Sequence, residues 1–220
     1  MVFQKFLSNT VAPICRSRIL ILLKRLPNEN YTSTLIDNLH RNHVSVDVIT
    51  STTPSGGLYQ KTMYEIATRT NGLCAFESDD HFAQTTNYMN KLDIPYTVYS
   101  VNVQVSGSGS ISLPTFIPPC TDQYCHVWLE MTVQDHGPMD SYRTANLTWE
   151  NMPTDSSGYL DNDANSLLYS DGTLLTTLRR FYSRVSYTMA LDYQYSNNET
   201  QIMQIRIFSD GPIDKWFPYD

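Results

Sequence analysis

The sequence predicts an α/β segment followed by an all-β segment: a partial, truncated Rossmann-like half-sheet and then an antiparallel β-sandwich. Over residues 18–92, short apolar runs alternate with stretches of helical period, which is the pattern of parallel strands wrapped by helices. Over residues 95–220, the spacing of apolar residues changes from about 3.6 to about 2, which indicates strands joined by turns. Residues 1–17 follow neither pattern, so we predict an irregular N-terminal segment.

The predicted parallel strands are the apolar runs Ile19–Leu23, Val44–Ile49 and Leu73–Phe76. Parallel neighbours need a crossover connection, which is usually a helix. The intervening stretches have helical period, and we predict crossover helices over Tyr31–His43 and Tyr59–Thr70.

A third helix is predicted over Asp79–Met89, because acidic residues open it at the positive end of its dipole. A sheet of so few strands leaves an edge unpaired. We therefore keep open an alternative function, a structural or assembly module whose sheet is completed by a partner strand or by self-association through the open edge.

The second segment alternates apolar and polar residues between clusters of Gly, Pro, Asn and Asp. This pattern predicts six or more strands in two packed antiparallel sheets. The run Ser106–Ser110 is predicted to be a hairpin turn. The predicted strands are Tyr96–Val105, Ile111–Phe116, Tyr124–Val133, Ala145–Glu150, Leu174–Leu178, Arg184–Tyr195 and Gln201–Ser209.

The chain contains four cysteines, an even number that is compatible with disulfides. Cys120 and Cys125 flank a short loop, and we predict a disulfide across it. The pairing of Cys15 and Cys74 stays open. None of the four lies in a Cys-x-x-Cys pair or has zinc-like spacing.

Three N-glycosylation triplets begin at Asn30, Asn146 and Asn198. Against secretion, the N-terminus MVFQKFLSNTVAPICRSR has no continuous apolar stretch of the kind a signal peptide requires. No segment approaches the roughly 20 apolar residues of a membrane span. A formal net charge of −7 without a basic run argues against binding to nucleic acid.

The first segment resembles a known family. The succession ILILLKRLPNENYTSTLIDNLHRNHVSVDVITS followed by GLYQKTMYEIATRTNGLCAFESDD resembles the closing half of a von Willebrand factor type A (VWA) domain, over about residues 19–89. Residues Glu65–Gly72 match the helical signature of that family. Its metal-dependent members use an Asp-x-Ser-x-Ser loop that this chain lacks, and Lys24-Arg25 stands where the family often has Asp-Gly. We therefore expect no metal site and no cofactor.

The second segment also resembles a family. YTVYSVNVQVSGSGSISLPTFIPPC and VWLEMTVQDHGPMDS are similar to a β-sandwich that follows a VWA domain in uncharacterised nematode extracellular proteins, some of which carry C-type lectin domains. The resemblance implies a secreted glycoprotein in a binding or innate-defence context. It also implies that the missing signal peptide and first strands have one explanation, an incomplete N-terminus.

Three further motifs are weaker. Asp135-His136 could serve a hydrolase as a charge-oriented base, but no Gly-x-Ser-x-Gly nucleophile turn accompanies it. His40 and His43 have a metal-compatible spacing, for which we expect a solvated helix face instead. Residues 161–165 begin like a calcium loop that lacks its Gly and its closing Glu.

The expected function is therefore a non-catalytic extracellular recognition protein for an unknown protein or carbohydrate ligand, without a metal-dependent adhesion site. Any ligand surface is expected on the loops of the sandwich. A hydrolase using Asp135 and His136 is the less favoured alternative.

Overall fold

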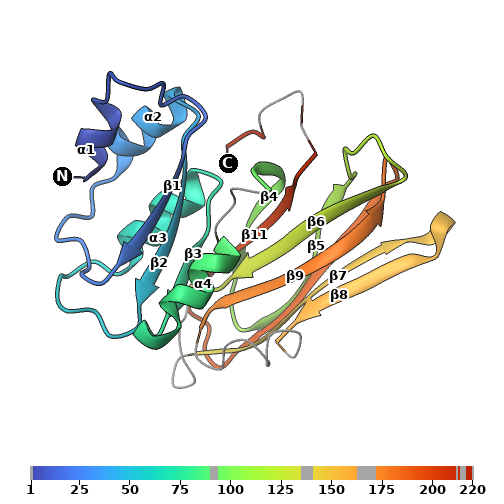
Figure 1. The fold of residues 1–220 in the computed structure, drawn as a ribbon. Coiled ribbons are helices and arrows are strands. Elements are labelled where there is room, and N and C mark those ends of the chain that lie inside the picture. Colours follow the sequence, from blue (N-terminus) through green and yellow to red (C-terminus); the bar gives the residue numbers. More distant parts are fainter. Residues whose placement is uncertain are drawn as a thin grey trace.

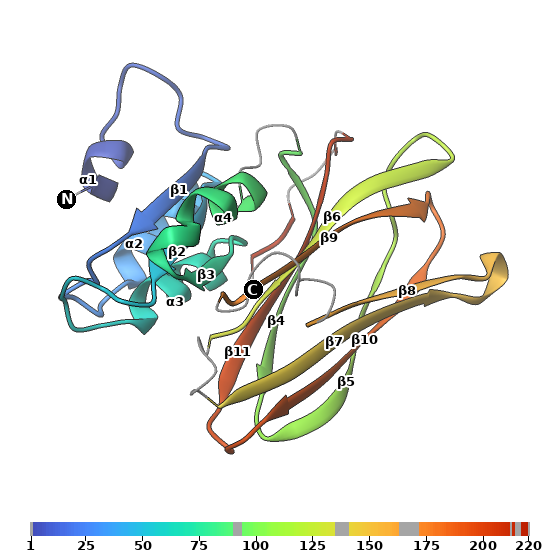
Figure 2. The same ribbon diagram turned by 60° about the horizontal axis from the view of Figure 1, so that its bottom comes forward.

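A computed structural model describes residues 2–89, 94–134, 141–162, 172–211, 213 and 217–219. An α/β unit lies beside a larger β-sandwich (Figures 1 and 2). The β-rich character and the sandwich-like sheets agree with the predicted fold class. No helix within the described ranges is long and apolar enough to cross a membrane.

The α/β unit has a parallel sheet in the order β1-β2-β3, covered by helices on both faces. Cluster contacts place α2 and α3 on one face, where Ile36 and Ile66 pack with Val46 and Val48. The other face packs against α4. The elements are β1 (Arg18–Leu23), α2 (Ser33–Arg41), β2 (Ser45–Ser51), α3 (Lys61–Arg69), β3 (Cys74–Glu77), the 3-10 turn η1 (Asp79–His81) and α4 (Phe82–Met89), all near their predicted positions.

The structure differs from the prediction at the N-terminus, where residues 1–17 were expected to be irregular. Helix α1 spans Val2–Leu7. Its Phe3, Phe6 and Leu7 follow the i, i+3, i+4 spacing of one helical face and pack against the cluster under α2 and α3. Tertiary packing stabilises a helix too short to form alone.

The sandwich consists of two antiparallel four-stranded sheets in the described residues, with orders β4-β11-β6-β9 and β5-β10-β7-β8. Inward-facing side chains of both sheets, such as Leu129, Leu147 and Ile205, form one buried core. The strands are β4 (Tyr96–Val105), β5 (Ser108–Phe116), β6 (Tyr124–Thr132), β7 (Tyr142–Asn151), β8 (Ser156–Asp161), β9 (Leu174–Tyr182), β10 (Tyr187–Tyr195) and β11 (Gln201–Ser209).

The predicted hairpin at Ser106–Ser110 is wrong, because β4 and β5 belong to different sheets. The turn at Gly107, with φ +62°, instead carries the chain across the sandwich. The connection between β10 and β11 also passes from one sheet to the other, and it lies next to the turn at Gly107. Gly107 N–H donates to Asn197 O, and Tyr195 N–H donates to Gly107 O. The N–H and C=O groups of Gly107, which form no hairpin bonds, are thus satisfied by the connection between β10 and β11.

Strand β8 was not predicted, because its sequence SSGYLD is short and polar at its start. It pairs with β7, with Gly158 opposite Trp149. A Cβ atom at Gly158 would lie 2.5 Å from the Trp149 indole, so only glycine fits beneath that ring.

Sheet β1-β2-β3 has two edges, and one of them is covered by the chain itself. At β3, Cys74 N–H donates to Gln204 Oε1 at 2.7 Å and Phe76 N–H donates to Thr173 Oγ1 at 2.9 Å. At the other edge, β1 pairs with β2 alone within the described ranges, and Leu22 is 53% exposed.

Candidate functional site

Open α/β sheets commonly bind ligands at the carboxyl ends of their parallel strands, and polar side chains gather there in this sheet. Lys24 follows β1, Ser51 ends β2 and Asp79 follows β3. The Lys24 ammonium forms an ion pair with Asp79 and lies 3.4 Å from Ser51 Oγ. Ser51 Oγ donates to Asp79 Oδ1 at 2.6 Å. A side-chain cation therefore joins the three strand ends.

Glu77 lies beside this ion pair and is fully buried. Its Oε1 accepts the Ser78 N–H at 2.7 Å, and its Oε2 accepts the Thr85 hydroxyl at 3.1 Å. The His81 ring nitrogen is 3.7 Å from Oε1. Local donors satisfy this carboxylate, so its role is to hold α4 against the end of β3.

This end of the sheet is poorly suited to nucleophilic chemistry. Ser51 is only 2% exposed and its hydroxyl is engaged with Asp79. A nucleophile must reach the substrate and needs a base positioned to take its proton. Among the described residues, no three His, Cys, Asp or Glu side chains are grouped so that they could hold a metal ion.

The predicted glycosylation residues lie in different settings. Asn30 and Asn198 are exposed in loops. Asn146 is half-buried in the middle of β7, between Asp161 of β8 and Asp192 of β10. Whether any of the three carries a glycan stays a prediction.

Two weaker sequence motifs cannot be placed. Asp135 and His136 lie outside the described residues, as does most of the calcium-like stretch, from residue 163 onward. His40 differs from the expected solvated helix face: it is half-buried, its Nε2 is 2.5 Å from Arg69 O, and its ring stacks on Tyr219 at 4.0 Å.

The predicted disulfide between Cys120 and Cys125 is confirmed. The other cysteines do not pair: Cys15 is exposed and Cys74 is buried. Burial raises the pKa of the Cys74 thiol to about 12, with a partial opposing effect from Thr50.

We expect a thiol reagent to label Cys15 alone in the native protein and Cys74 only after unfolding, because the buried thiol is neutral and inaccessible. Cys15→Ser should then abolish native labelling, whereas labelling of Cys74 at a similar rate would contradict the structure.

The raised pKa of the Cys74 thiol means that the folded state keeps this proton to a higher pH than the unfolded state does. The free energy of unfolding should therefore fall as the pH rises from about 9 to about 12, and Cys74→Ala should weaken this fall in urea titrations.

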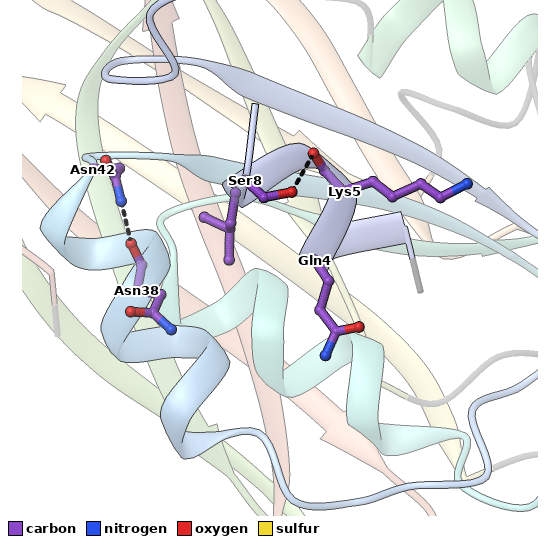
Figure 3. A pocket seen from close by; sticks show the side chains of 6 residues that line it. Gln4, Lys5, Ser8, Asn38 and Asn42 are labelled. Carbon is purple, nitrogen blue, oxygen red and sulfur yellow. Dashed lines mark hydrogen bonds between the residues drawn. The ribbon is translucent and has the colours of Figure 1, made fainter. Parts of the chain in front are cut away.

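An open pocket of about 690 Å³ lies between α1 and α2 (Figure 3). Polar side chains from both helices line it, including Gln4, Lys5, Asn38 and Asn42. Two of these polar groups bond within their own helix region: Ser8 Oγ donates to Lys5 O, and Asn42 Nδ2 donates to Asn38 O. The pocket offers no group of ionisable side chains for chemistry.

A more distinctive surface lies on the outer face of the sandwich sheet that contains β6 and β9. Val127 and Phe181 point into the core, so their neighbours along each strand point outward. Paired across the two strands are Tyr124 with Tyr182, His126 with Arg180, and Trp128 with Leu178. We call these outward residues the β6–β9 strip: Tyr124, His126, Trp128, Leu178, Arg180 and Tyr182.

Aromatic and cationic groups contact one another along the strip. The rings of Tyr124 and Tyr182 are 4.8 Å apart, and the Arg180 guanidinium lies 4.3 Å from the Tyr124 ring centre. Hydrogen bonding to Tyr124 raises the pKa of the Tyr182 hydroxyl, so this group stays neutral at physiological pH. At the end of the strip nearest α4, the Tyr88 ring contacts the Trp128 ring edge-on, with 6.1 Å between the ring centres.

The strip is exposed, although its two strands are well packed underneath. Arg180 and His126 are exposed, Leu178 is 50% exposed, and the aromatic residues are half-buried. Figure 1 shows β6 and β9 continuing beyond α4. Sequence reasoning missed this surface. The signal was available, since aromatic and cationic residues occupy alternate positions in YCHVW and LRRFY.

Comparison with known families decides the classification of the sandwich. A family described as a domain of unknown function (DUF7154) matches residues 101–210, which is half of the chain. The chain belongs to this family. The DUF7154 region runs from the middle of β4 to the end of β11 and contains the whole β6–β9 strip.

Other comparisons add little to the DUF7154 assignment. A search of curated proteins finds no match. A solved structure of the Clostridium thermocellum endo-1,4-β-D-xylanase 10B, with its CBM22-1 and GH10 modules complexed with xylohexaose, matches at 8% identity and a TM-score of 0.28. The match covers 57% of this chain and 30% of the xylanase chain. A likeness this low carries no argument about fold or ligand.

Proposed function

We propose that this protein is a non-catalytic extracellular recognition protein that binds its ligand through the β6–β9 strip. The observation that supports the proposal is the row of half-buried aromatic side chains beside the exposed His126 and Arg180 on one face of a sheet. Aromatic residues and Arg supply most of the binding energy at recognition surfaces. Clusters of apolar side chains on a protein surface often mark interaction sites.

The proposal includes an α/β unit of the VWA type that serves as a scaffold and lacks a metal-dependent adhesion site. Three parallel strands in the order β1-β2-β3 with helices on both faces support this scaffold. The ion pair of Lys24 with Asp79 supports the absence of metal-dependent binding, because an ammonium among the strand ends repels a divalent cation.

The extracellular setting is supported by the disulfide between Cys120 and Cys125, since disulfides persist in oxidising compartments. The exposed triplets at Asn30 and Asn198 are compatible with a glycoprotein in that setting. The assembly alternative is restricted to the β1 edge, because the β3 edge already bonds to Gln204 and Thr173 of the same chain.

The proposal is tested by binding of the purified protein to a printed panel of oligosaccharides and peptides. We expect binding that resists EDTA and falls about tenfold or more in the double variant Tyr124→Ala/Tyr182→Ala. Tyr159→Ala is the matched control, because Tyr159 is 57% exposed on the opposite sheet. Binding that the double variant leaves unchanged would exclude the strip as the binding surface, and binding that EDTA abolishes would exclude metal-independent recognition.

A further inference from the structure

We propose that the β6–β9 strip binds an acidic carbohydrate, a glycan chain that carries carboxylate or sulfate groups. This inference rests on the proposed function and names its ligand class. It follows from the combination of ring surfaces, a stacked guanidinium and neighbouring hydroxyls on one flat face.

The aromatic residues supply the surface for the sugar rings. One face of a pyranose ring carries mainly C–H bonds and packs well against an aromatic ring, while its hydroxyls remain available at the edge. Tyr124 and Trp128 are four residues apart on β6, with His126 between them. Outward residues recur about every 7 Å along a strand, so the strip can follow successive units of an extended chain.

Arg180 supplies the recognition of the acidic group. Its guanidinium is exposed and held over the Tyr124 ring at 4.3 Å. Stacking on an aromatic ring orders the planar guanidinium and leaves its N–H edge free to donate two parallel hydrogen bonds to a carboxylate or sulfate.

The charge pattern around Arg180 also favours an anion. His126 lies directly opposite Arg180 across the strand pair and points out of the same face of the sheet. The strip itself contains no carboxylate, although the chain as a whole has a formal net charge of −7. A local cationic surface on an acidic protein attracts an anionic ligand to that surface and repels it elsewhere.

A sugar fits the geometry better than an acidic peptide. Peptides that bind sheets commonly add a strand at a free edge, where backbone groups are unpaired. The strip instead stands on the face of the sheet, where the backbone of β6 is paired with β11 on one side and β9 on the other. β9 is the last strand of this sheet in the described residues, and a peptide added at its edge would lie beside the strip and not over its side chains. The ligand must therefore be recognised by side chains, through ring faces and an anion contact.

The test is equilibrium binding of the full chain to four probes: a heparin hexasaccharide, a galacturonate hexamer, cellohexaose and a hexaglutamate peptide. We expect one of the acidic saccharides to bind at least about tenfold more tightly than cellohexaose and hexaglutamate, with weakening as NaCl rises from about 50 to about 500 mM. The heparin and galacturonate probes distinguish a sulfate from a carboxylate ligand.

Arg180→Gln should weaken binding of the acidic saccharide about tenfold or more. Arg143→Gln removes the same charge from an exposed position on β7 of the opposite sheet and should leave the affinity unchanged. Because both arginines are exposed, thermal unfolding of the two variants should match that of the unmodified chain and verify that each is folded.

Two outcomes overturn the carbohydrate inference and leave recognition by the strip intact. One is tight binding of cellohexaose that Tyr124→Ala/Tyr182→Ala abolishes but Arg180→Gln does not. The other is hexaglutamate binding as tightly as the saccharides, with sensitivity to Arg180→Gln. If neither these probes nor the printed panel show binding that depends on the strip, the proposed function fails together with the inference.

Discussion

Gln204→Leu is expected to lower the free energy of unfolding by about 3–5 kcal/mol, because it leaves several buried polar groups without partners. Gln204 is fully buried on β11 between the sandwich and the α/β unit. Its Oε1 accepts the Cys74 N–H and the Thr132 hydroxyl, each at 2.7 Å. Its Nε2 donates to Thr68 Oγ1 at 2.7 Å. A leucine of similar size fills the volume and satisfies none of these groups.

Urea unfolding followed by circular dichroism and by tryptophan fluorescence measures this effect. Gln104→Leu is the matched control, since Gln104 is exposed on β4 and should tolerate the change within about 0.5 kcal/mol. A loss below about 1 kcal/mol for Gln204→Leu would mean that water or a rearranged backbone replaces the side chain.

The same measurement shows whether the two units unfold together. Gln204 joins them through Cys74 and Thr68, and the Tyr64 hydroxyl adds a bond to Ile202 O at 2.7 Å. A buried network of this kind couples the stabilities of the elements it connects. We expect one transition in the unmodified protein and separated α/β and sandwich transitions in Gln204→Leu.

Local patterns were sufficient to predict most individual elements. The helical period gave α2 and α3, the alternation of period two gave the long sandwich strands, and the close spacing of Cys120 and Cys125 gave their disulfide. Each of these features depends on residues that are near in sequence. Helix α1 and strand β8 were missed because their stability comes from tertiary partners, the α2/α3 cluster for one and Trp149 with β7 for the other.

Non-local features could not be predicted in the same way. Along β11, QIMQIRIFS alternates apolar and polar residues, a pattern that usually indicates one face in water. In the structure the polar face is buried as well, because Gln204 and Arg206 pack against the α/β unit. The β6–β9 strip shows the opposite case. Its aromatic residues are of a type that often forms a core, but the pairing of β6 with β9 places them on the outer face of the sheet. Only the pairing of distant strands distinguishes the two faces.

Arg206→Met is the second substitution with a large expected effect, a loss of about 3–5 kcal/mol. Arg206 is the largest fully buried side chain among the described residues. Its Nη1 donates to Val101 O and to Ile205 O, each at 3.0 Å. Its Nη2 donates to Asn102 Oδ1 at 2.8 Å and to Thr68 O at 3.5 Å. Methionine matches the length of the chain but leaves these acceptors without a donor.

Glu130 is fully buried and lies directly opposite Arg206 in the pairing of β11 with β6, and we expect this carboxylate to decide the size of the effect. Removing one member of a buried pair of opposite charges leaves the other charge buried without compensation and lowers the free energy of unfolding. Replacing both members by apolar residues often leaves that free energy unchanged. We therefore expect Arg206→Met/Glu130→Leu to recover at least about half of the stability lost in Arg206→Met, in urea unfolding of all four members of the double-mutant cycle. Arg179→Met, at an exposed position of β9, is the control and should change little. Strictly additive losses would show that Glu130 is stabilised independently of Arg206, and that the cost of Arg206→Met comes from the four oxygen acceptors of the guanidinium alone.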